Sequence, residues 1–330
     1  MRVLTILLVA MAVCALFPYT HAGSEKIEVV STLQIFSSIV KQIGGLYVHS
    51  TFIVPSGTDI HDYSLTSEDM HKIERATLVV LASSEFFSVD RNIKEAAKSK
   101  RILDFQNYNA TLLPLGDMKK CVHGYWLYTK NAIGIARAIY NTLSTLDPTH
   151  TDYFFQNYRE FLKELNNSLS LSIQMIHDSG VYGKGVLLTV PGVFYIAKEL
   201  GMNIRGVLVE GPNQFASSED ITKYRKEMVT GDITMILNVK NLESSSAGRM
   251  AVELSKETGV PVVYLNIFST TNYTRLILEN AGAISSSNSV KHYYEGEGNC
   301  WPYIYTITIL AATSAILLVI ALSYRRELLK

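Results

Sequence analysis

Two histidines of this chain stand where an α/β protein can gather ligands for a metal ion. His61 follows a β-branched run and a turn with proline and glycine, and it precedes a predicted helix. His123 lies in the segment Cys121–Leu127, ahead of another predicted helix that begins near Asn131. Imidazole suits zinc and related first-row ions. Taken alone, two histidines do not establish a site, because a histidine is more often an ordinary surface or cleft residue.

The elements that must position these histidines alternate between short β-branched runs and stretches with helical spacing. In the first part of the chain we expect strands at 26–32, 49–55 and 78–82 and helices at 35–43 and 66–76. In the last part we expect strands at 185–190, 233–238 and 261–265, followed by helices that end at Leu200 or span 244–258 and 273–281. This alternation predicts parallel sheets with crossover helices, which bind ligands beyond the carboxyl ends of the strands.

One long helical segment, Thr149–Asp178, separates the two α/β blocks. It keeps apolar or aromatic residues at helical spacing, and neither proline nor glycine interrupts it before Gly180. Asp147 is the predicted cap and Pro148 the predicted first residue. A helix of about 30 residues runs about 45 Å, so we expect a rigid spine that joins two lobes.

Both ends of the chain predict export and membrane attachment. A basic start, an apolar run from Leu4 to Phe17 and a small-residue stop at Ala22 form the pattern of a secretory signal. An uncleaved anchor and a lipid-attachment box at Cys14 are the alternatives, and the latter fits its preceding residues poorly. Tyr303–Tyr324 carries no charged residue and precedes Arg325 and Arg326, which predicts a membrane-spanning helix with a cytoplasmic tail.

The predicted fold class is therefore α/β: two parallel-sheet lobes joined by a long rigid spine helix, plus a C-terminal transmembrane helix. We expect a single-pass protein of the cell membrane, with its body on the extracytoplasmic side and its C-terminus in the cytoplasm. The predicted parts are a signal peptide (1–22), an N-terminal lobe (23–147), the spine (148–179), a C-terminal lobe (180–284), a stalk (285–302), the transmembrane helix (303–324) and a tail (325–330).

Composition excludes some classes of protein. The chain has 30 Lys and Arg against 30 Asp and Glu, so no charge excess favours nucleic acid. Beyond the predicted signal only Cys121 and Cys300 remain, too few for a disulfide framework or a cysteine zinc knuckle. Whether these two cysteines form a bridge is left open by the sequence.

The stretch Val54–Asp69 resembles a motif of the zinc- and manganese-binding solute receptors that serve ABC importers. That motif reads Pro-x-Gly-x-x-x-His-x-Tyr-x-x-Thr-x-x-Asp, and this chain matches each named position from Pro55 to Asp69. The likeness extends over nearly all of residues 27–282, including Ser31–Gly45, His123 with Trp126, the start of the spine at Asp147, and the segment from Lys256 to Leu265. The resemblance implies two lobes on a rigid helix, a metal ion in the cleft and delivery to a permease.

The chain departs from this family at the ligands of the second lobe. Where the family usually has a histidine or glutamate after the first strand of that lobe, this chain has Val190, and its last ligand, an aspartate, is replaced by Asn266. Glu85 and Glu210 are the nearest carboxylates that could fill the gap, although both could be ordinary loop residues. Asp62 is expected to orient the ring of His61. The histidine-rich loop of zinc receptors is also missing, since 105–120 contains no histidine.

The sequence thus predicts a membrane-tethered extracytoplasmic binding protein, not an enzyme, that captures a divalent metal for an ABC importer. The metal, of zinc or manganese type, is the transported ligand, and the predicted ligands are His61, His123 and Asn266. The expected partner is a permease in the same membrane, and no nucleic acid is expected. The alternatives are a degenerate receptor that binds a metal chelate or another solute, a metal-dependent surface or adhesion protein, and a hydrolase that uses both histidines.

Overall fold

The computed structural model describes residues 26–58, 60–61, 63–211, 214–240, 242–268 and 270–295. The chain forms two compact units, and it passes between them more than once. The first unit holds the chain up to Ala110, then 131–163 and 268–273; the second holds 111–130, 164–267 and the chain from Thr274 onward. The predicted signal peptide, Asp62 and Cys300 lie outside the described residues.

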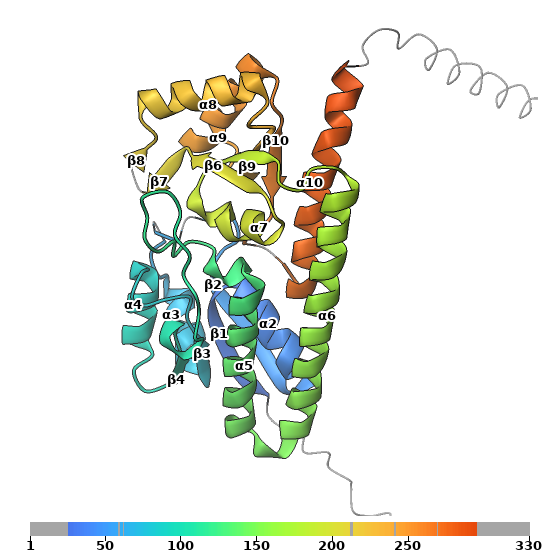
Figure 1. The fold of residues 1–330 in the computed structure, drawn as a ribbon. Helices are drawn as coiled ribbons and strands as arrows, with labels where there is room; N and C mark the ends of the chain where they lie inside the picture. The colour runs from blue at the N-terminus through green and yellow to red at the C-terminus, as the bar shows by residue number, and fades with distance from the viewer. Residues whose placement is uncertain are drawn as a thin grey trace, which may run out of the picture. The chain divides into compact units, whose positions relative to one another are not determined.

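The first unit is built on a four-stranded parallel sheet with the order β2-β1-β3-β4. Its strands are β1 (Ile27–Leu33), β2 (Val48–Val54), β3 (Leu78–Val80) and β4 (Arg101–Leu103). Its α-helices are α2 (Gln34–Gly44), α3 (Ser67–Arg75), α4 (Ser88–Ala96), most of α5 (Thr129–Leu146) and the first part of α6 (Thr151–Asp178), as Figure 1 shows. Short 3₁₀ turns lie at Gly45–Tyr47, Phe105–Asn107 and Pro148–His150.

The second unit repeats this plan with a four-stranded parallel sheet in the order β10-β9-β5-β6. Its strands are β5 (Gly185–Leu188), β6 (Asn203–Val207), β9 (Met235–Val239) and β10 (Val262–Leu265), with a small hairpin of β7 (Val209–Gly211) and β8 (Gln214–Phe215). Its α-helices are α7 (Phe194–Glu199), α8 (Ser218–Thr230), α9 (Ser246–Thr258), α10 (Tyr273–Glu295) and the second part of α6. Two 3₁₀ turns lie at Tyr125–Leu127 and Pro191–Val193.

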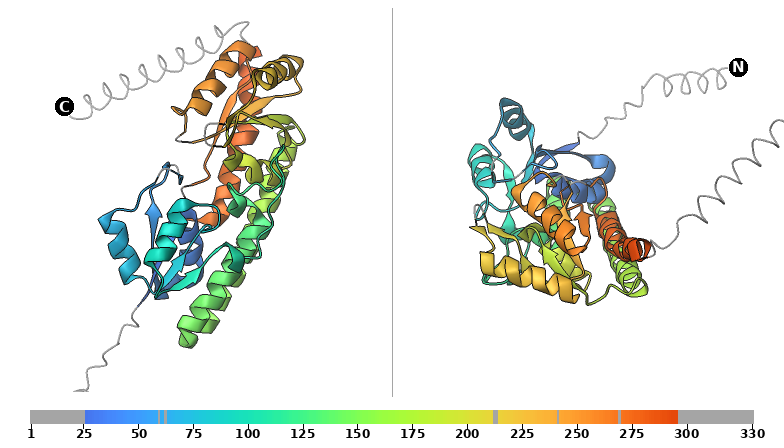
Figure 2. Two further views of the ribbon diagram at one scale, coloured as in Figure 1. Left: turned by 90° about the vertical axis from the view of Figure 1, so that its left-hand side faces the viewer. Right: turned by 90° about the horizontal axis from the view of Figure 1, so that it is seen from above.

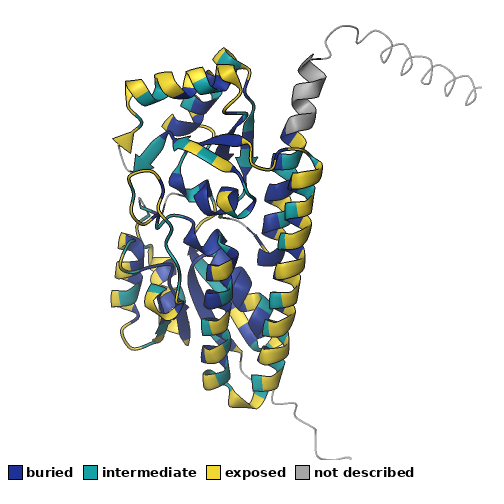
Figure 3. Cartoon of the chain, in the orientation of Figure 1, coloured by how far each residue is buried: buried dark blue, intermediate teal, exposed yellow. Residues whose placement is uncertain are grey.

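The core of each unit lies between its sheet and the apolar faces of its helices. The central strands β1, β3, β5 and β9 are buried along most of their length, whereas the helices show exposed outer faces (Figure 3). In the second unit α10 runs along the second half of α6, as Figures 1 and 2 both show. A hydrogen bond of 3.0 Å from the Thr274 hydroxyl to Glu164 joins these two helices. Burial of apolar helix faces against parallel strands is thus what stabilises each sheet.

The predicted α/β alternation with parallel sheets is confirmed, and the spine segment is one continuous helix from Thr151 to Asp178. Its start differs from the prediction. Pro148–His150 forms a separate 3₁₀ turn, and Asp147 makes no capping hydrogen bond because its carboxylate contacts the His150 ring nitrogen at 2.6 Å. Helix α10 also continues to Glu295, so it includes the first residues of the segment predicted as a stalk.

The predicted C-terminal transmembrane helix needs correction. Among the described residues, no helix combines the length and the apolar character that are needed to cross a bilayer. The longest ones, α6 and α10, carry charged residues along their sequences. The predicted span Tyr303–Tyr324 lies outside the described residues.

Two helical glycines give a test of the packing. A Cβ at Gly134 of α5 would lie 2.1 Å from the carbonyl oxygen of Tyr108, whereas one at Gly282 of α10 would lie 3.9 Å from the Met175 side chain. Gly134→Ala should therefore destabilise the fold by about 1–3 kcal/mol through overpacking. Gly282→Ala, the matched control, should stabilise it by up to about 1 kcal/mol, because alanine is the better helix former. Urea unfolding measures both changes, and a stabilised Gly134→Ala variant would contradict the packing described here.

Candidate metal-binding site

His61 lies in the loop that leaves the carboxyl end of β2 in the first unit. The loop begins with a tight turn in which the Thr58 amide donates to the Pro55 carbonyl at 3.1 Å. Gly57 has φ 85°, a left-handed conformation that favours glycine at this place in a turn. The Ser56 hydroxyl donates to the side chain of Gln34 at 2.6 Å and so ties the turn to the start of α2. The proline and glycine of the motif thus fix where the loop leaves the sheet.

The other end of the His61 loop is held by a buried carboxylate. Asp69, which is 2% exposed, accepts hydrogen bonds from the Tyr63 hydroxyl at 2.7 Å and from the Thr66 amide at 2.9 Å. The Thr66 side chain in turn accepts from the Asp69 amide, which completes a capping box at the start of α3. Asp69 therefore anchors the chain from Tyr63 to Thr66, which follows His61. The tyrosine, threonine and aspartate of the motif have a structural role that presents the histidine.

These hydrogen bonds also set the charge state of the anchor. Burial alone raises the pKa of Asp69, but hydrogen bonds from Thr66 and Tyr63 and the charge of Lys72 together hold that pKa below its ordinary value. Burial and the neighbouring Asp69 raise the pKa of Tyr63 to about 12. Asp69 is thus an anion and Tyr63 a neutral donor at physiological pH.

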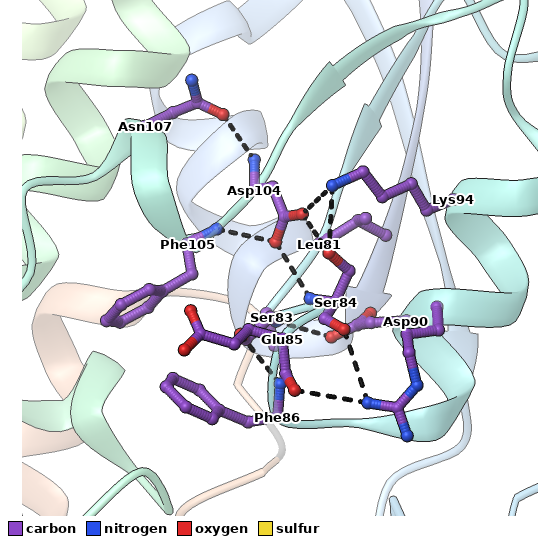
Figure 4. Close-up of polar contacts among 12 residues, drawn as sticks. Leu81, Ser83, Ser84, Glu85, Phe86, Asp90, Lys94, Asp104, Phe105 and Asn107 are labelled. Carbon is purple, nitrogen blue, oxygen red and sulfur yellow. Dashed lines mark hydrogen bonds and ion pairs between the residues drawn. The ribbon is translucent and has the colours of Figure 1, made fainter. Parts of the chain in front are cut away.

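A second loop of the first unit packs against His61. The Phe87 ring, which is fully buried, lies 5.6 Å from the His61 ring between centroids, with the planes inclined by 58°. The same loop, Ser83–Phe87 between β3 and α4, carries Glu85, which is exposed (Figure 4). The structure thus places Glu85 on the loop that contacts His61.

In the second unit three loops meet around His123. Gly124 has φ 72°, and a Cβ there would lie 2.3 Å from the carbonyl oxygen of Gly192. A Cβ at Gly192 would lie 2.9 Å from the Ile267 side chain. Residue 123 is therefore next to the turn that follows Val190, and that turn is next to the segment of Asn266. The structure brings together the positions of His123, Val190 and Asn266 in one unit, although His123 falls within the N-terminal lobe that the sequence predicts (23–147).

Hydrogen bonds hold these three loops in place. The Tyr195 hydroxyl of α7 donates to the Cys121 carbonyl at 2.7 Å and accepts from the Leu113 amide at 2.9 Å. Asn280 of α10 clamps the backbone of Asn266: it accepts from the Asn266 amide and donates to the Asn266 carbonyl, both at 2.8 Å. Because its backbone is fixed on both sides, the side chain of Asn266 leaves a defined point of the chain.

Two further residues of this region do not suit a metal ion. Val190 has an apolar side chain, so its position supplies no side-chain donor. Cys121 is buried and forms no disulfide among the described residues, and burial raises the pKa of its thiol to about 11. A thiol with that pKa stays protonated at physiological pH and is a poor ligand.

The predicted site residues therefore fall into two groups. His61 and Glu85 belong to the first unit, and His123 and Asn266 belong to the second. Glu210 also belongs to the second unit, but it lines a separate cavity of about 460 Å³ beside β6, together with Lys198 and Arg205. Within the described residues, no group of three or more His, Cys, Asp or Glu side chains is placed to hold a metal ion.

Some residues that shape the two groups were missed by sequence reasoning. Phe87 and Asn280 lie far along the chain from the histidine and asparagine that they hold, and no local pattern marks them. Gly124 could have been found, because a glycine directly after a candidate ligand indicates a turn or a close approach.

Comparison with known proteins decides the family. The profile of the family described as "Zinc-uptake complex component A periplasmic" matches residues 29–287. The chain belongs to this family. It is accordingly an extracytoplasmic metal-binding receptor of the kind that serves ABC importers, and a binding protein rather than an enzyme. The resemblance to the zinc- and manganese-binding solute receptors, inferred from the sequence, is confirmed.

The relatives are receptors for metals. The chain is 23% identical to the "Manganese ABC transporter substrate-binding lipoprotein PsaA" of Streptococcus mitis, over 81% of this chain and 88% of that protein. It is 25% identical to the "Metal ABC transporter substrate-binding lipoprotein SloC" of Streptococcus mutans, over 78% and 86%. The fold is similar to "Crystal structure of ZnuA", with a TM-score of 0.69, 19% identity, and coverage of 80% of this chain and 100% of that one. A manganese-bound protein from candidatus liberibacter asiaticus gives a TM-score of 0.63 at 20% identity, with 79% and 98% covered.

These names confirm, at the level of the family, that zinc or manganese is the ligand, and they correct the predicted localisation. Both curated relatives are named lipoproteins, which are attached through a lipid rather than through a spanning helix. The predicted single-pass arrangement with a cytoplasmic C-terminus is therefore wrong on this comparison.

The anchor of the His61 loop gives a test with a defined pH dependence. Asp69→Asn removes the anionic acceptor, so it should destabilise the protein by about 1.5–3 kcal/mol at pH 7. Because the folded-state pKa of Asp69 is lowered, its contribution is present above the ordinary pKa of 3.8 and is lost as the pH falls through the folded-state value. The gap between parent and variant should therefore be constant from pH 7 to pH 5 and close in stronger acid, as measured by urea unfolding.

Asp220 supplies the matched control for this test. It completes the same capping box with Ser217 at the start of α8, but on the surface. Asp220→Asn should cost less, because solvent can replace the lost hydrogen bonds. A gap for Asp69→Asn that stays unchanged down to pH 3, or that equals the effect of Asp220→Asn, would contradict the anchoring role.

Proposed function

We propose that this receptor captures a first-row divalent metal ion, zinc or manganese, through His61 and His123 and delivers it to the permease of an ABC importer. The observation that carries the proposal is the presentation of His61. A turn at Gly57, a capping box at Asp69 and the ring of Phe87 all fix one histidine at the carboxyl end of a parallel sheet, where such folds bind ligands.

The second unit supports the proposal of metal binding with two further donors, His123 and Asn266. His123 comes two residues after Cys121, whose carbonyl accepts a hydrogen bond from the Tyr195 hydroxyl. It directly precedes Gly124, whose left-handed backbone conformation favours glycine. Asn266, fixed through its backbone by Asn280, offers a neutral carbonyl oxygen. Since Val190 offers no donor, the proposed ligands are two imidazoles and one amide oxygen, with solvent or a carboxylate completing the coordination.

This donor set predicts weak and poorly selective binding. Zinc sites usually have three or four protein ligands, and carboxylates or thiolates neutralise the charge of the ion. The proposed ligands here are all neutral. Affinity among first-row ions then follows their general order, unless geometry imposes a different one.

Membrane attachment enters the proposal only as far as the relatives support it. Both curated relatives are named lipoproteins. The family match and both groups of predicted ligands lie within residues 29–287, so capture of the ion does not depend on how the chain is attached.

A receptor for a metal chelate is the second candidate, and Val190 and Asn266 favour it. A chelator would supply the charged donors that these two positions lack. Binding of a preformed chelate would then need the fold but not both histidines, and this difference separates the two candidates.

Calorimetric titration of the full chain with zinc and with manganese tests the leading proposal. His61→Ala and His123→Ala should each abolish detectable binding, because either change leaves one imidazole. His49→Ala is the matched control: His49 lies on β2 of the same unit, is exposed and pairs with Glu28, so its removal should change nothing. Heat that is absent with every ion, or unchanged in His61→Ala, would reject direct metal binding and favour the chelate receptor.

Restoring a charge should strengthen binding. Asn266→Asp replaces a neutral oxygen with an anionic one at a point that Asn280 already fixes, so affinity should rise by about tenfold or more. Binding should weaken in acid, because a protonated imidazole cannot be a ligand. Glu85→Gln and Glu210→Gln test whether a local carboxylate completes the site. Replacing a carboxylate that binds the ion will weaken binding, and replacing one that does not will leave the affinity unchanged. An Asn266→Asp variant with unchanged affinity would remove Asn266 from the proposed ligands.

A further inference from the structure

The loop Ser83–Phe87 contacts His61 through Phe87, and two buried carboxylates hold this loop. The first is Asp90, which is fully buried on α4. One of its oxygens accepts from the hydroxyl of Thr32 at the end of β1, and the other accepts from the Ser83 amide at 2.6 Å. The hydroxyl of Thr32 also accepts from the Ala82 amide at 3.4 Å. Asp90 thus joins the carboxyl end of β1 to the start of the loop that follows β3.

The second carboxylate is Asp104, which follows β4 and is 1% exposed. Its Oδ1 accepts from the Ser84 amide at 3.0 Å, and its Oδ2 accepts from the Ser84 hydroxyl. Lys94 of α4 forms an ion pair with Asp104 at 2.8 Å and donates to the Ser84 hydroxyl at 3.1 Å (Figure 4). Asp104 thus joins the end of β4 to the next residue of the same loop.

Further contacts complete the hold on the loop. The Phe86 amide donates to the Ser83 hydroxyl at 3.3 Å, and the Phe87 amide donates to the Ser83 carbonyl at 3.0 Å. Arg91 donates to the Glu85 carbonyl at 3.3 Å. Asp90 fixes Ser83, Asp104 fixes Ser84, and Ser83 fixes the two phenylalanines. The chain of contacts therefore runs from the two carboxylates to the ring that lies against His61.

Asp90 is a costly residue to keep in a core. It lies on the buried face of α4 with Val89 and Ile93, where an apolar side chain would pack without losing hydration. Burial raises its pKa to about 7, and the charge of Asp104 adds to that rise. Asp104 differs: burial raises its pKa, but hydrogen bonds from Lys94 and Ser84 together hold it below its ordinary value. Hydrogen bonds must therefore offset the cost of burying this carboxylate. The hydrogen bonds of Asp90 come from Thr32 at the end of β1 and from Ser83 of the loop.

We propose that Asp90 and Asp104 are positioning residues of the metal site: they hold the Ser83–Phe87 loop, and through Phe87 they set the orientation of the His61 imidazole. This inference rests on the proposed function, since it concerns His61 as a ligand. It assigns a role to two carboxylates that are not ligands themselves. It also explains why a buried acid is kept on α4.

The test follows the His61 ring by NMR in the full chain labelled with ¹³C-histidine, first without metal. The signal is assigned with His61→Gln. Asp90→Ala leaves the Ser83 amide without its acceptor, so the His61 signal should shift and zinc affinity should fall about 10- to 100-fold, the range for groups that orient metal ligands. Asp90→Asn keeps an oxygen that accepts from the Ser83 amide, and its amide NH2 can donate to the Thr32 hydroxyl in place of the original bond. It should therefore restore both the signal and most of the affinity.

Two further variants keep the test decisive. Phe87→Leu keeps an apolar side chain without a ring and should shift the His61 signal, so it decides the matter if Asp90→Ala does not fold. Asp147→Ala is the matched control, because Asp147 is a carboxylate of the same unit that contacts His150 at 2.6 Å and takes no part in the loop. It should leave the His61 signal and the affinity unchanged.

The outcomes separate this inference from the proposed function. A His61 signal that is the same in the parent, Asp90→Ala and Phe87→Leu overturns the positioning role, even if the parent binds zinc. A shift as large in Asp147→Ala also overturns it, because the effect would then be unspecific. If the parent binds no metal while its His61 signal responds to Asp90→Ala and Phe87→Leu, the proposed function fails and the positioning of His61 stands.

Discussion

The first unit depends on one constraint: the loops that leave the carboxyl ends of parallel strands must be held by side chains, because sheet hydrogen bonds stop where the strands stop. Buried carboxylates meet this need here. Asp69 holds the loop after β2, Asp90 holds the loop after β3 to the end of β1, and Asp104 holds it to the end of β4. Each carboxylate accepts two or more hydrogen bonds from a loop and its neighbours, which compensates for the loss of hydration. His61 belongs to the first of these loops and packs against Phe87 of the second.

In the second unit, the described loops of the predicted site are held by close packing and by neutral hydrogen bonds. Gly124 and Gly192 let three loops approach closely, and Tyr195 and Asn280 supply neutral hydrogen bonds to the backbone. The predicted donors of this unit, His123 and Asn266, carry no negative charge. The negative charge that a divalent ion needs is therefore not provided by these positions, and this is the physical basis for expecting weak binding or a ligand that brings its own charge.

Much of the fold could be predicted because it depends on local patterns. The β-branched runs and the uninterrupted spacing from Thr151 to Asp178 predict the sheets and α6 correctly. The prediction was wrong for the transmembrane helix, which rested on the length of an uncharged run and on the basic residues after it. Asp90 could not have been recognised: an acid on a nine-residue helix reads as a solvent-exposed residue, and its burial depends on Thr32 and Ser83, which come from other elements. The motif around His61 was readable because all its supporting residues are close in sequence, whereas Phe87 and Asn280 act across the fold.

X-ray absorption at the zinc edge of the loaded full chain tests the central claim most directly, because it reads the ligands themselves. The account predicts two imidazole nitrogens at about 2.0–2.1 Å, with oxygen donors completing the shell and no sulfur. The His123→Ala variant, loaded at excess zinc, should show a single imidazole. A sulfur ligand at about 2.3 Å, or an oxygen-only shell in the parent, would contradict a site built from His61 and His123.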